Sequence, residues 1–216
     1  ITLTTKVFLE GFSVGSANYG SVNGEMDNGG VNGLGGGLLY FLGLSSDPLD
    51  VDDMQVSLMD PVTYAEVATA PGVLKTDGTL TVNFPSVSAG SYYIKLNHRN
   101  SIETWSATAV SLGSVASYDF SSAASQAYGD NMVEVSPGVW ALYSGDISDA
   151  NVLGLGYGYQ DGIVESQDYS DMETANFFND QGYIPGDISG DGIVESTDYS
   201  IIEGNNFFNR ALMRPY

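Results

Sequence analysis

The chain has 216 residues and a formal net charge of −21 at pH 7, with 27 acidic and 6 basic side chains. This balance excludes nucleic-acid binding, which needs clustered Lys and Arg, and it disfavours an anionic membrane surface. Cysteine is absent and His98 is the single histidine, so disulfides, thiolate catalysis and Cys- or His-rich metal sites are excluded. No apolar run approaches the roughly 20 residues that span a bilayer.

Short runs of alternating apolar and polar residues predict strands in the first two thirds of the chain. The runs are 6–10, 38–44, 55–59, 79–84, 92–96, 104–112 and 133–143. Turn residues such as Asp60-Pro61 and Asp77-Gly78 separate them, and no long amphipathic helix is expected before residue 145. The pattern predicts an antiparallel β-sandwich over residues 1–144, with a Gly- and Asn-rich surface loop at 15–37.

An internal repeat marks residues 145–216 as a separate module. The stretch DGIVESQDYS returns as DGIVESTDYS, and the motifs Gly-Asp-Ile-Ser and Asn-Phe-Phe-Asn each occur twice. The matching segments are 161–170 with 191–200, 145–148 with 186–189, and 176–179 with 206–209. The unequal shifts place an insertion in the first copy, within 149–160. Two copies of one short unit predict a small pseudo-symmetric module.

The second copy has the spacing of an EF-hand-type calcium loop. Oxygen donors occupy loop positions 1, 3 and 5, glycine allows the turn at 6, a backbone carbonyl serves at 7, and carboxylates follow at 9 and 12. The expected ligands are Asp187, Ser189, Asp191, Ile193 (through its carbonyl), Glu195 and Asp198. The apolar Ile193 side chain is expected to point into the core. A helix is expected to start near Thr197 and to run towards Phe207 and Phe208.

The first copy supplies the equivalent donors, but the insertion interrupts them. They are Asp146, Ser148, Asp161, Ile163, Glu165 and Asp168. Either the insertion loops out and the site survives, or Asp149 or Asn151 replaces an early ligand, or this copy has lost the ion and remains only as packing. Two calcium ions are expected, because so many carboxylates in two small loops would repel one another without cations. The acidic residues at 47–53 are expected on a solvated face, with a further calcium site as the alternative.

Two features separate the repeat from an ordinary EF-hand. Position 12 is Asp, and a Pro-Gly step precedes position 1 in place of an entering helix. With these features, the duplicated pattern D-x-[SN]-x-D-G-x-[IV]-x-S-x-D resembles a type I dockerin module. The resemblance implies two calcium loop–helix units, with loop positions 10 and 11 facing a cohesin-type partner. Those positions are Ser166, Gln167, Ser196 and Thr197.

The earlier part of the chain carries a second resemblance. Residues 7–12, 91–106, 118–120 and 140–146 look like the C-terminal β-sandwich plus dockerin-like unit of large secreted and surface proteins of environmental bacteria. That resemblance implies an extracellular, calcium-bound, non-catalytic module.

No catalytic constellation stands out in the sequence. His98 lies at a strand end, where a solvated or hydrogen-bonded group is expected instead of a catalyst, and Trp105 and Trp140 are expected in the core, with a sugar-stacking platform as the alternative. We therefore expect an extracellular or cell-surface structural or adhesive protein, a component of a matrix, surface layer or fibre, and not an enzyme. A cohesin-type protein-docking module is the first alternative and a carbohydrate-binding β-sandwich the second. The expected partners are calcium and other protein chains, through self-assembly or a cohesin-like protein, or polysaccharide in the second alternative.

Overall fold

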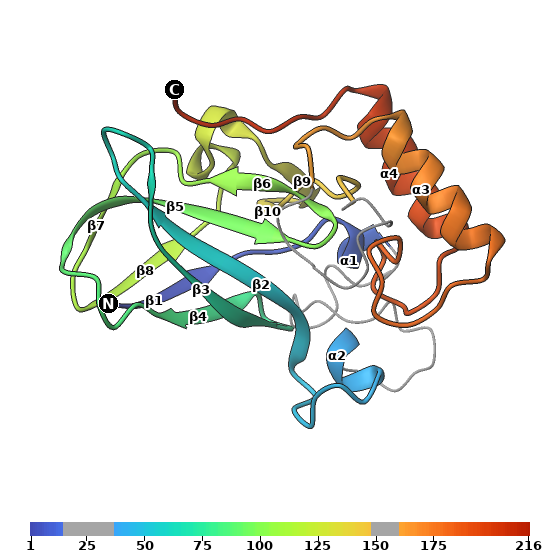
Figure 1. Cartoon of the computed structure of the whole chain (residues 1–216), viewed down its shortest axis with the longest axis horizontal. Helices are drawn as coiled ribbons and strands as arrows, with labels where there is room; N and C mark the ends of the chain where they lie inside the picture. The colour runs from blue at the N-terminus through green and yellow to red at the C-terminus, as the bar shows by residue number, and fades with distance from the viewer. Residues whose placement is uncertain (15–36, 148–159) are drawn as a thin grey trace.

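A sandwich of two sheets and a pair of helices make up the computed structural model, which describes residues 1–14, 37–147 and 160–216 (Figure 1). Nearly all of the predicted loop at 15–37, together with Ser148 and most of the insertion at 149–160, lies outside these residues.

The sandwich is built from one larger and one smaller sheet. The larger sheet has the strand order β3-β2-β5-β6, with β7 also paired to β5, and the smaller has the order β4-β1-β8. Their bounds are β1 (Thr2–Lys6), β2 (Asp50–Met59), β3 (Glu66–Lys75), β4 (Thr79–Asn83), β5 (Gly90–His98), β6 (Ser101–Trp105), β7 (Val110–Leu112) and β8 (Val115–Asp119). The prediction of a purely antiparallel sandwich was wrong at one place, because β1 pairs with β8 in parallel, Thr2 opposite Val115. The chain is otherwise mainly β, as the alternating runs predicted.

Alternation along the strands creates the core between the sheets. In β1 and β4, Leu3, Leu80 and Val82 face inward, and in β5 Ile94 and Leu96 do the same. Each such side chain stabilises the fold by about 1.5–3 kcal/mol relative to an exposed one. Trp105 is 2% exposed, so it is buried as expected, but it packs edge-to-face with Tyr93 at 6.0 Å and not within this core. Trp140 packs partly buried against the core.

Some predicted strands were misplaced, for local reasons. The run 38–44 forms a helical turn, α2 (Leu38–Phe41), with a glycine at each end. Gly37 packs so tightly before the turn that a Cβ there would lie 2.0 Å from the Asp50 carbonyl oxygen, and Gly43 (φ +71°) reverses the chain after it. The run 6–10 is no strand beyond Lys6, and 104–112 is divided between β6 and β7. The run 133–143 is confirmed as a hairpin of β9 (Val133–Ser136) and β10 (Val139–Ala141), which turns at Gly138 (φ +76°).

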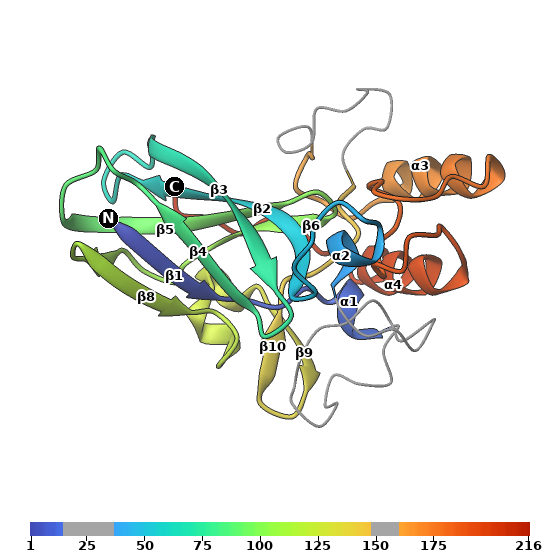
Figure 2. The ribbon, with the colours of Figure 1, turned by 90° about the horizontal axis from the view of Figure 1, so that it is seen from below.

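The remaining elements are short, except for two helices at the C-terminal end. Before residue 145 these are α1 (Gly11–Val14) and two 3-10 turns, η1 (Ala124–Gln126) and η2 (Tyr128–Asp130). The two helices are α3 (Ser166–Phe177) and α4 (Ser196–Phe207), which lie side by side at one end of the sandwich (Figures 1 and 2). None of the described helices is long and apolar enough to cross a membrane.

The helices enclose a second core that is not confined to their own segment. Val164, Met172, Val194 and Ile202 form its centre, and Ile102 of β6 with Tyr143 completes it from the sandwich side. The loop of the second copy, residues 187–198, is called loop two below, and the corresponding loop of the first copy is called loop one. Loop two also packs closely against α1, since a Cβ on Gly11 would lie 1.9 Å from the Ile188 carbonyl oxygen. The predicted division into domains 1–144 and 145–216 stays a prediction, because the second core takes side chains from both sides of the boundary.

Candidate functional site

Each repeat forms one loop–helix unit that a carboxylate closes. Glu165 and Glu195 are the N-cap residues of α3 and α4. The Glu165 amide donates to Asp168 Oδ2 at 2.9 Å, and the Glu195 amide donates to Asp198 Oδ2 at 2.8 Å. A carboxylate in the first helical turn satisfies an otherwise unpaired amide and interacts favourably with the helix dipole. The residues at loop position 12 therefore serve as helix caps in both copies.

The two units interlock with two-fold regularity. The apex of each loop pairs with the segment that follows the other helix, Ile163 with Ala211 and Ile193 with Gln181. Matching amides close both pairings, Leu212 to the Gly162 carbonyl at 2.6 Å and Gly182 to the Gly192 carbonyl at 2.8 Å. These bonds join the repeats into one pseudo-symmetric body, as the duplication predicted.

Position 7 of each loop corrects one expectation. Ile193 does not point into the core, since its side chain is 42% exposed, and Ile163 is 41% exposed. The next residues, Val164 and Val194, are buried in the second core instead. The edge pairing at position 7 turns that side chain outward, so the apolar residue at position 8 fills the core.

The second loop buries its acidic donors. Asp187 and Asp198 are 0% exposed. Asp187 Oδ1 accepts the amides of Gly190 and Asp191 at 3.0 and 3.1 Å, and Asp198 Oδ1 accepts those of Ile188 and Ser189 at 2.8 and 2.7 Å. Gly192 has φ +84°, the left-handed conformation that the sharp turn at position 6 requires. By contrast, Asp187 Oδ2 makes no hydrogen bond at all.

The described part of the first loop repeats this arrangement. Asp168 Oδ1 accepts the Ile147 amide and Asp161 Oδ1 accepts the Ile163 amide, both at 2.9 Å, as Asp198 and Asp191 do in loop two. Asp146 is 1% exposed, and neither of its carboxylate oxygens makes a hydrogen bond. Ser148, Asp149 and Asn151 lie outside the described residues.

Burial disfavours the charged form of the carboxylates in both loops. Burial, with Asp168 and Asp161 close by, raises the pKa of Asp146 to about 8. Burial raises the pKa of Asp187 to about 7 against the influence of Arg99, and burial raises that of Asp168 to about 6. Desolvation penalises a charged carboxylate, and neighbouring carboxylates add repulsion. A bound cation would remove both penalties.

The donor set suits a hard divalent cation, although its side chains do not converge as they stand. Within residues 1–14, 37–147 and 160–216, no three Asp, Glu, His or Cys side chains are grouped closely enough to hold a metal ion. Asp198 Oδ1 already accepts two backbone amides, but Asp198 Oδ2 and Asp191 Oδ1 each accept one and keep a second lone pair for a cation. The buried, unbonded oxygens of Asp187 and Asp146 are the donors that most need one.

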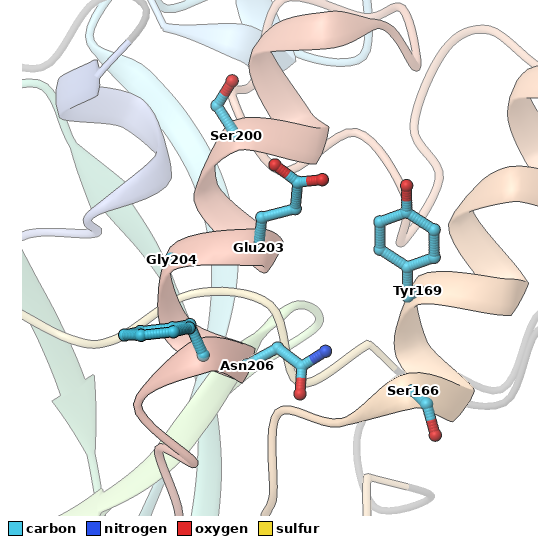
Figure 3. A pocket seen from close by; sticks show the side chains of 7 residues that line it. Ser166, Tyr169, Ser200, Glu203, Gly204 and Asn206 are labelled. Carbon is cyan, nitrogen blue, oxygen red and sulfur yellow. The ribbon is translucent and has the colours of Figure 1, made fainter.

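The pair of helices presents a groove with a mixed polar and apolar lining, which includes Phe207, and two aromatic tips. The groove has a volume of about 730 Å³ and runs between the helices, where Tyr169 of α3 faces Glu203 and Asn206 of α4 (Figure 3). Ser166, Gln167 and Ser196 are exposed near the helix starts, and Thr197 is half-buried and donates to Glu195 Oε1 at 2.7 Å. Exposed rings end the helices: Phe177 (79%), Phe178 (67%), Phe207 (79%) and Phe208 (63%). Sequence reasoning found the duplicated motif but not the exposure of its rings.

A buried polar cluster joins the second loop to the sandwich. Asp52 of β2 is 0% exposed; it accepts hydrogen bonds from Arg99 Nε at 3.0 Å and from the Tyr183 hydroxyl at 2.5 Å, and His98 Nε2 lies 3.1 Å from its Oδ2. Burial opposes its ionisation, yet Arg99 and His98 hold the pKa of Asp52 well below its usual range. The solvated face expected for the acidic residues at 47–53 was therefore wrong for Asp52, and also for Asp50, which is 8% exposed. His98 is hydrogen-bonded, as its strand-end position suggested, through Nδ1 to the Ser101 hydroxyl at 3.0 Å.

Comparison with known proteins gives a likeness in solved structures only. No family model matches the chain, and no curated protein matches it either. Two similar solved structures are a C-terminal and an N-terminal interface mutant of the type II cohesin–X-dockerin complex from Acetivibrio cellulolyticus. Each has 14% sequence identity and a TM-score of 0.49, and covers 97% of this chain and 96% of the other. At these values no property of those complexes is transferred to this chain.

These findings correct the assignment of residues 145–216 to the type I dockerins and that of the whole chain to the secreted-protein units. The solved structures align along the mostly β chain as a whole, its β-sandwich included, and belong to type II cohesin–X-dockerin complexes. No family model or curated protein supports either resemblance. The duplicated loop–helix geometry remains as a feature of this chain without that family name.

Proposed function

We propose that this chain is an extracellular, non-catalytic protein-docking module whose C-terminal loop–helix pair is stabilised by calcium. The observation that carries the proposal is the pair of exposed diphenylalanine tips on two interlocked helices. Large exposed apolar groups that are rimmed by polar residues are typical of protein-binding surfaces. Aromatic anchors also supply much of the affinity in such interfaces.

A residue with positive φ follows each Phe pair and ends the helix there. Asn179 and Asn209 directly follow the two pairs and have positive φ, +52° and +49°. A residue in this conformation terminates a helix and reverses the chain. Consequently both Phe pairs stay largely exposed, although the Arg210 guanidinium lies 5.2 Å over the Phe208 ring. The rings of each pair pack edge-to-face at 5.2 and 5.1 Å.

Calcium enters the proposal through the buried donors of the loops. Loop two would hold one ion with Asp187, Ser189, Asp191, the Ile193 carbonyl, Glu195 and Asp198. Loop one would hold another with Asp146, Ser148, Asp161, the Ile163 carbonyl, Glu165 and Asp168. Calcium prefers six to eight oxygen donors of these kinds. The bound ions would neutralise the buried carboxylates, so metal binding would contribute to the free energy of folding.

The other expected roles have less support. A structural or adhesive role through self-assembly rests on no particular contact among the residues described, and docking is favoured over it. A sugar-stacking platform loses one of its two tryptophans, because Trp105 is only 2% exposed.

The test is capture of a partner by the immobilised full chain with calcium, from extracellular proteins of its source. Phe177→Ala with Phe178→Ala, and separately Phe207→Ala with Phe208→Ala, should reduce capture of one defined protein at least tenfold, a loss typical of interface anchors of about 2 kcal/mol. Val115→Ala is the matched control, an equally exposed apolar residue on the sandwich (79%). Capture that survives both double variants would refute docking through these tips. Calcium-dependent polymers of the pure chain would instead favour self-assembly.

A further inference from the structure

Arg99 reaches from the sandwich to the first calcium donor of loop two. It follows β5 directly and is 3% exposed. Its Nε donates to Asp52 Oδ2, its Nη1 donates to the Ile184 carbonyl, and its guanidinium lies 4.9 Å over the Tyr183 ring. These three contacts hold this charge in one position.

The remaining guanidinium nitrogen faces Asp187. Arg99 Nη2 lies 3.7 Å from Asp187 Oδ2, and both atoms are buried without a hydrogen bond. Asp187 Oδ1 already accepts two backbone amides, so Oδ2 is the oxygen left for a metal ion. The oxygen that calcium would take is therefore the oxygen that Arg99 neutralises.

We propose that Arg99 is an internal counter-ion of loop two. It lowers the calcium affinity of this loop, and it links calcium binding there to the sandwich, because Arg99 follows β5 directly. The inference rests on the proposed calcium function. A fixed positive charge beside a cation site opposes binding, because like charges a few ångströms apart repel strongly where water is scarce. The same charge partly compensates Asp187 when the loop is empty.

The two loops differ in this respect. None of the seven ion pairs found among the described residues involves Asp146, the equivalent donor of loop one. Arg99 also sits beside Asn100, whose Nδ2 donates to the Asp187 carbonyl at 2.9 Å. Calcium binding in loop two would thus affect the contacts that Arg99 and Asn100, between β5 and β6, make with Asp187. Among the described residues, no such counter-ion faces Asp146 of loop one.

The test measures calcium affinity by titration against a competing chelator, in the full chain with loop one silenced by Asp161→Ala. Arg99→Met should tighten binding at loop two on the order of tenfold or more, because it removes a nearby positive charge. Arg99→Lys, which keeps the charge, should change the affinity much less. Lys6→Met removes one positive charge from an exposed strand residue and should leave the affinity within about twofold.

A second variant keeps the test decisive if Arg99→Met fails to fold, since that change leaves Asp52 without its arginine. Asp52→Asn combined with Arg99→Met removes both charges of the buried pair and should still tighten binding, but by less, because Arg99 lies beside Asp187 while the lost Asp52 charge had favoured the cation. Unchanged or weaker binding in whichever of these variants folds would overturn the role of Arg99. Absence of calcium binding in the parent chain and in all variants would instead overturn the calcium function, and this inference with it.

Discussion

Asp198 links helix formation and loop closure through one carboxylate. Its two oxygens accept the amides of Ile188, Ser189 and Glu195, all within 2.8 Å. It is fully buried, and burial raises its pKa. A side chain with these bonds stabilises the unit even before any cation arrives, and the sequence pattern for calcium cannot separate that capping role from ligation.

Asp198→Ala should therefore destabilise the chain with and without calcium. The lost cap costs about 1 kcal/mol, and each buried amide left without an acceptor adds about 1–3 kcal/mol. Thermal unfolding in excess chelator would reveal this part, and the metal content at saturating calcium should fall by one ion. Asp180→Ala, at an exposed carboxylate of the same module, is the control. Equal stability of the two variants in chelator would contradict the capping role.

The two loop–helix units form the element that calcium should stabilise most. A ligand that binds only the folded state adds about 2.7 kcal/mol at a hundredfold excess over its dissociation constant. Chelation should therefore make residues 160–216 the first site of limited proteolysis, before the sandwich strands are cut. The cleavage sites, mapped by mass spectrometry with calcium or with chelator, provide the measurement. A pattern that chelation leaves unchanged would refute calcium binding by this module.

At the scale of elements, periodicity predicted the strands that have one buried face. The runs 79–84 and 92–96 fall on β4 and β5, where buried and more exposed residues alternate. The run 55–59 covers the second half of β2, a central strand that is mostly buried on both faces. β3 was missed because Pro71 argues against a strand, yet β3 is an edge strand, where a missing amide is tolerated. The run 38–44 shows the converse limit, since a short apolar run fits a buried helical turn as well as a strand.

The candidate site was predictable only where its residues are close in sequence. Loop spacing singled out the acidic residues of both repeats, and the backbone hydrogen bonds of Asp161, Asp168, Asp191 and Asp198 repeat from one loop to the other, while their role as calcium donors stays a prediction. The buried polar cluster around Asp52 has no such spacing pattern in the sequence, because Asp52 and Tyr183 are 131 residues apart. Only tertiary folding brings them together, and the pattern of charges at 47–53 suggested solvent instead.

At the scale of the whole molecule, two buried polar contacts connect the sandwich to the helices. One is the Asp52–Arg99 cluster at loop two. The other is Glu10, whose Oε2 accepts the Asn205 side chain of α4 at 2.6 Å and the Ser144 amide at 2.9 Å. Both contacts join the sandwich to the helices, so they couple the stability of one part to that of the other.

Asp52→Ala tests this connection, because it leaves Arg99 and His98 buried without their carboxylate. Removing one partner of a buried ion pair costs about 3–5 kcal/mol, more than the pair itself contributes, since the remaining charge stays desolvated. Urea unfolding, followed by the fluorescence of the buried Trp105, should show that loss in the free energy of unfolding.

Two further variants serve as controls. Asp77→Ala, at an exposed carboxylate in the β3–β4 turn, should cost about 1 kcal/mol or less. Asp52→Asn with Arg99→Met should recover part of the loss, because neither charge of the Asp52–Arg99 pair is left unpaired, although Asp187 then lacks Arg99 as its counter-ion. If Asp52→Ala is no more destabilising than Asp77→Ala, the buried cluster does not hold the two parts of the molecule together.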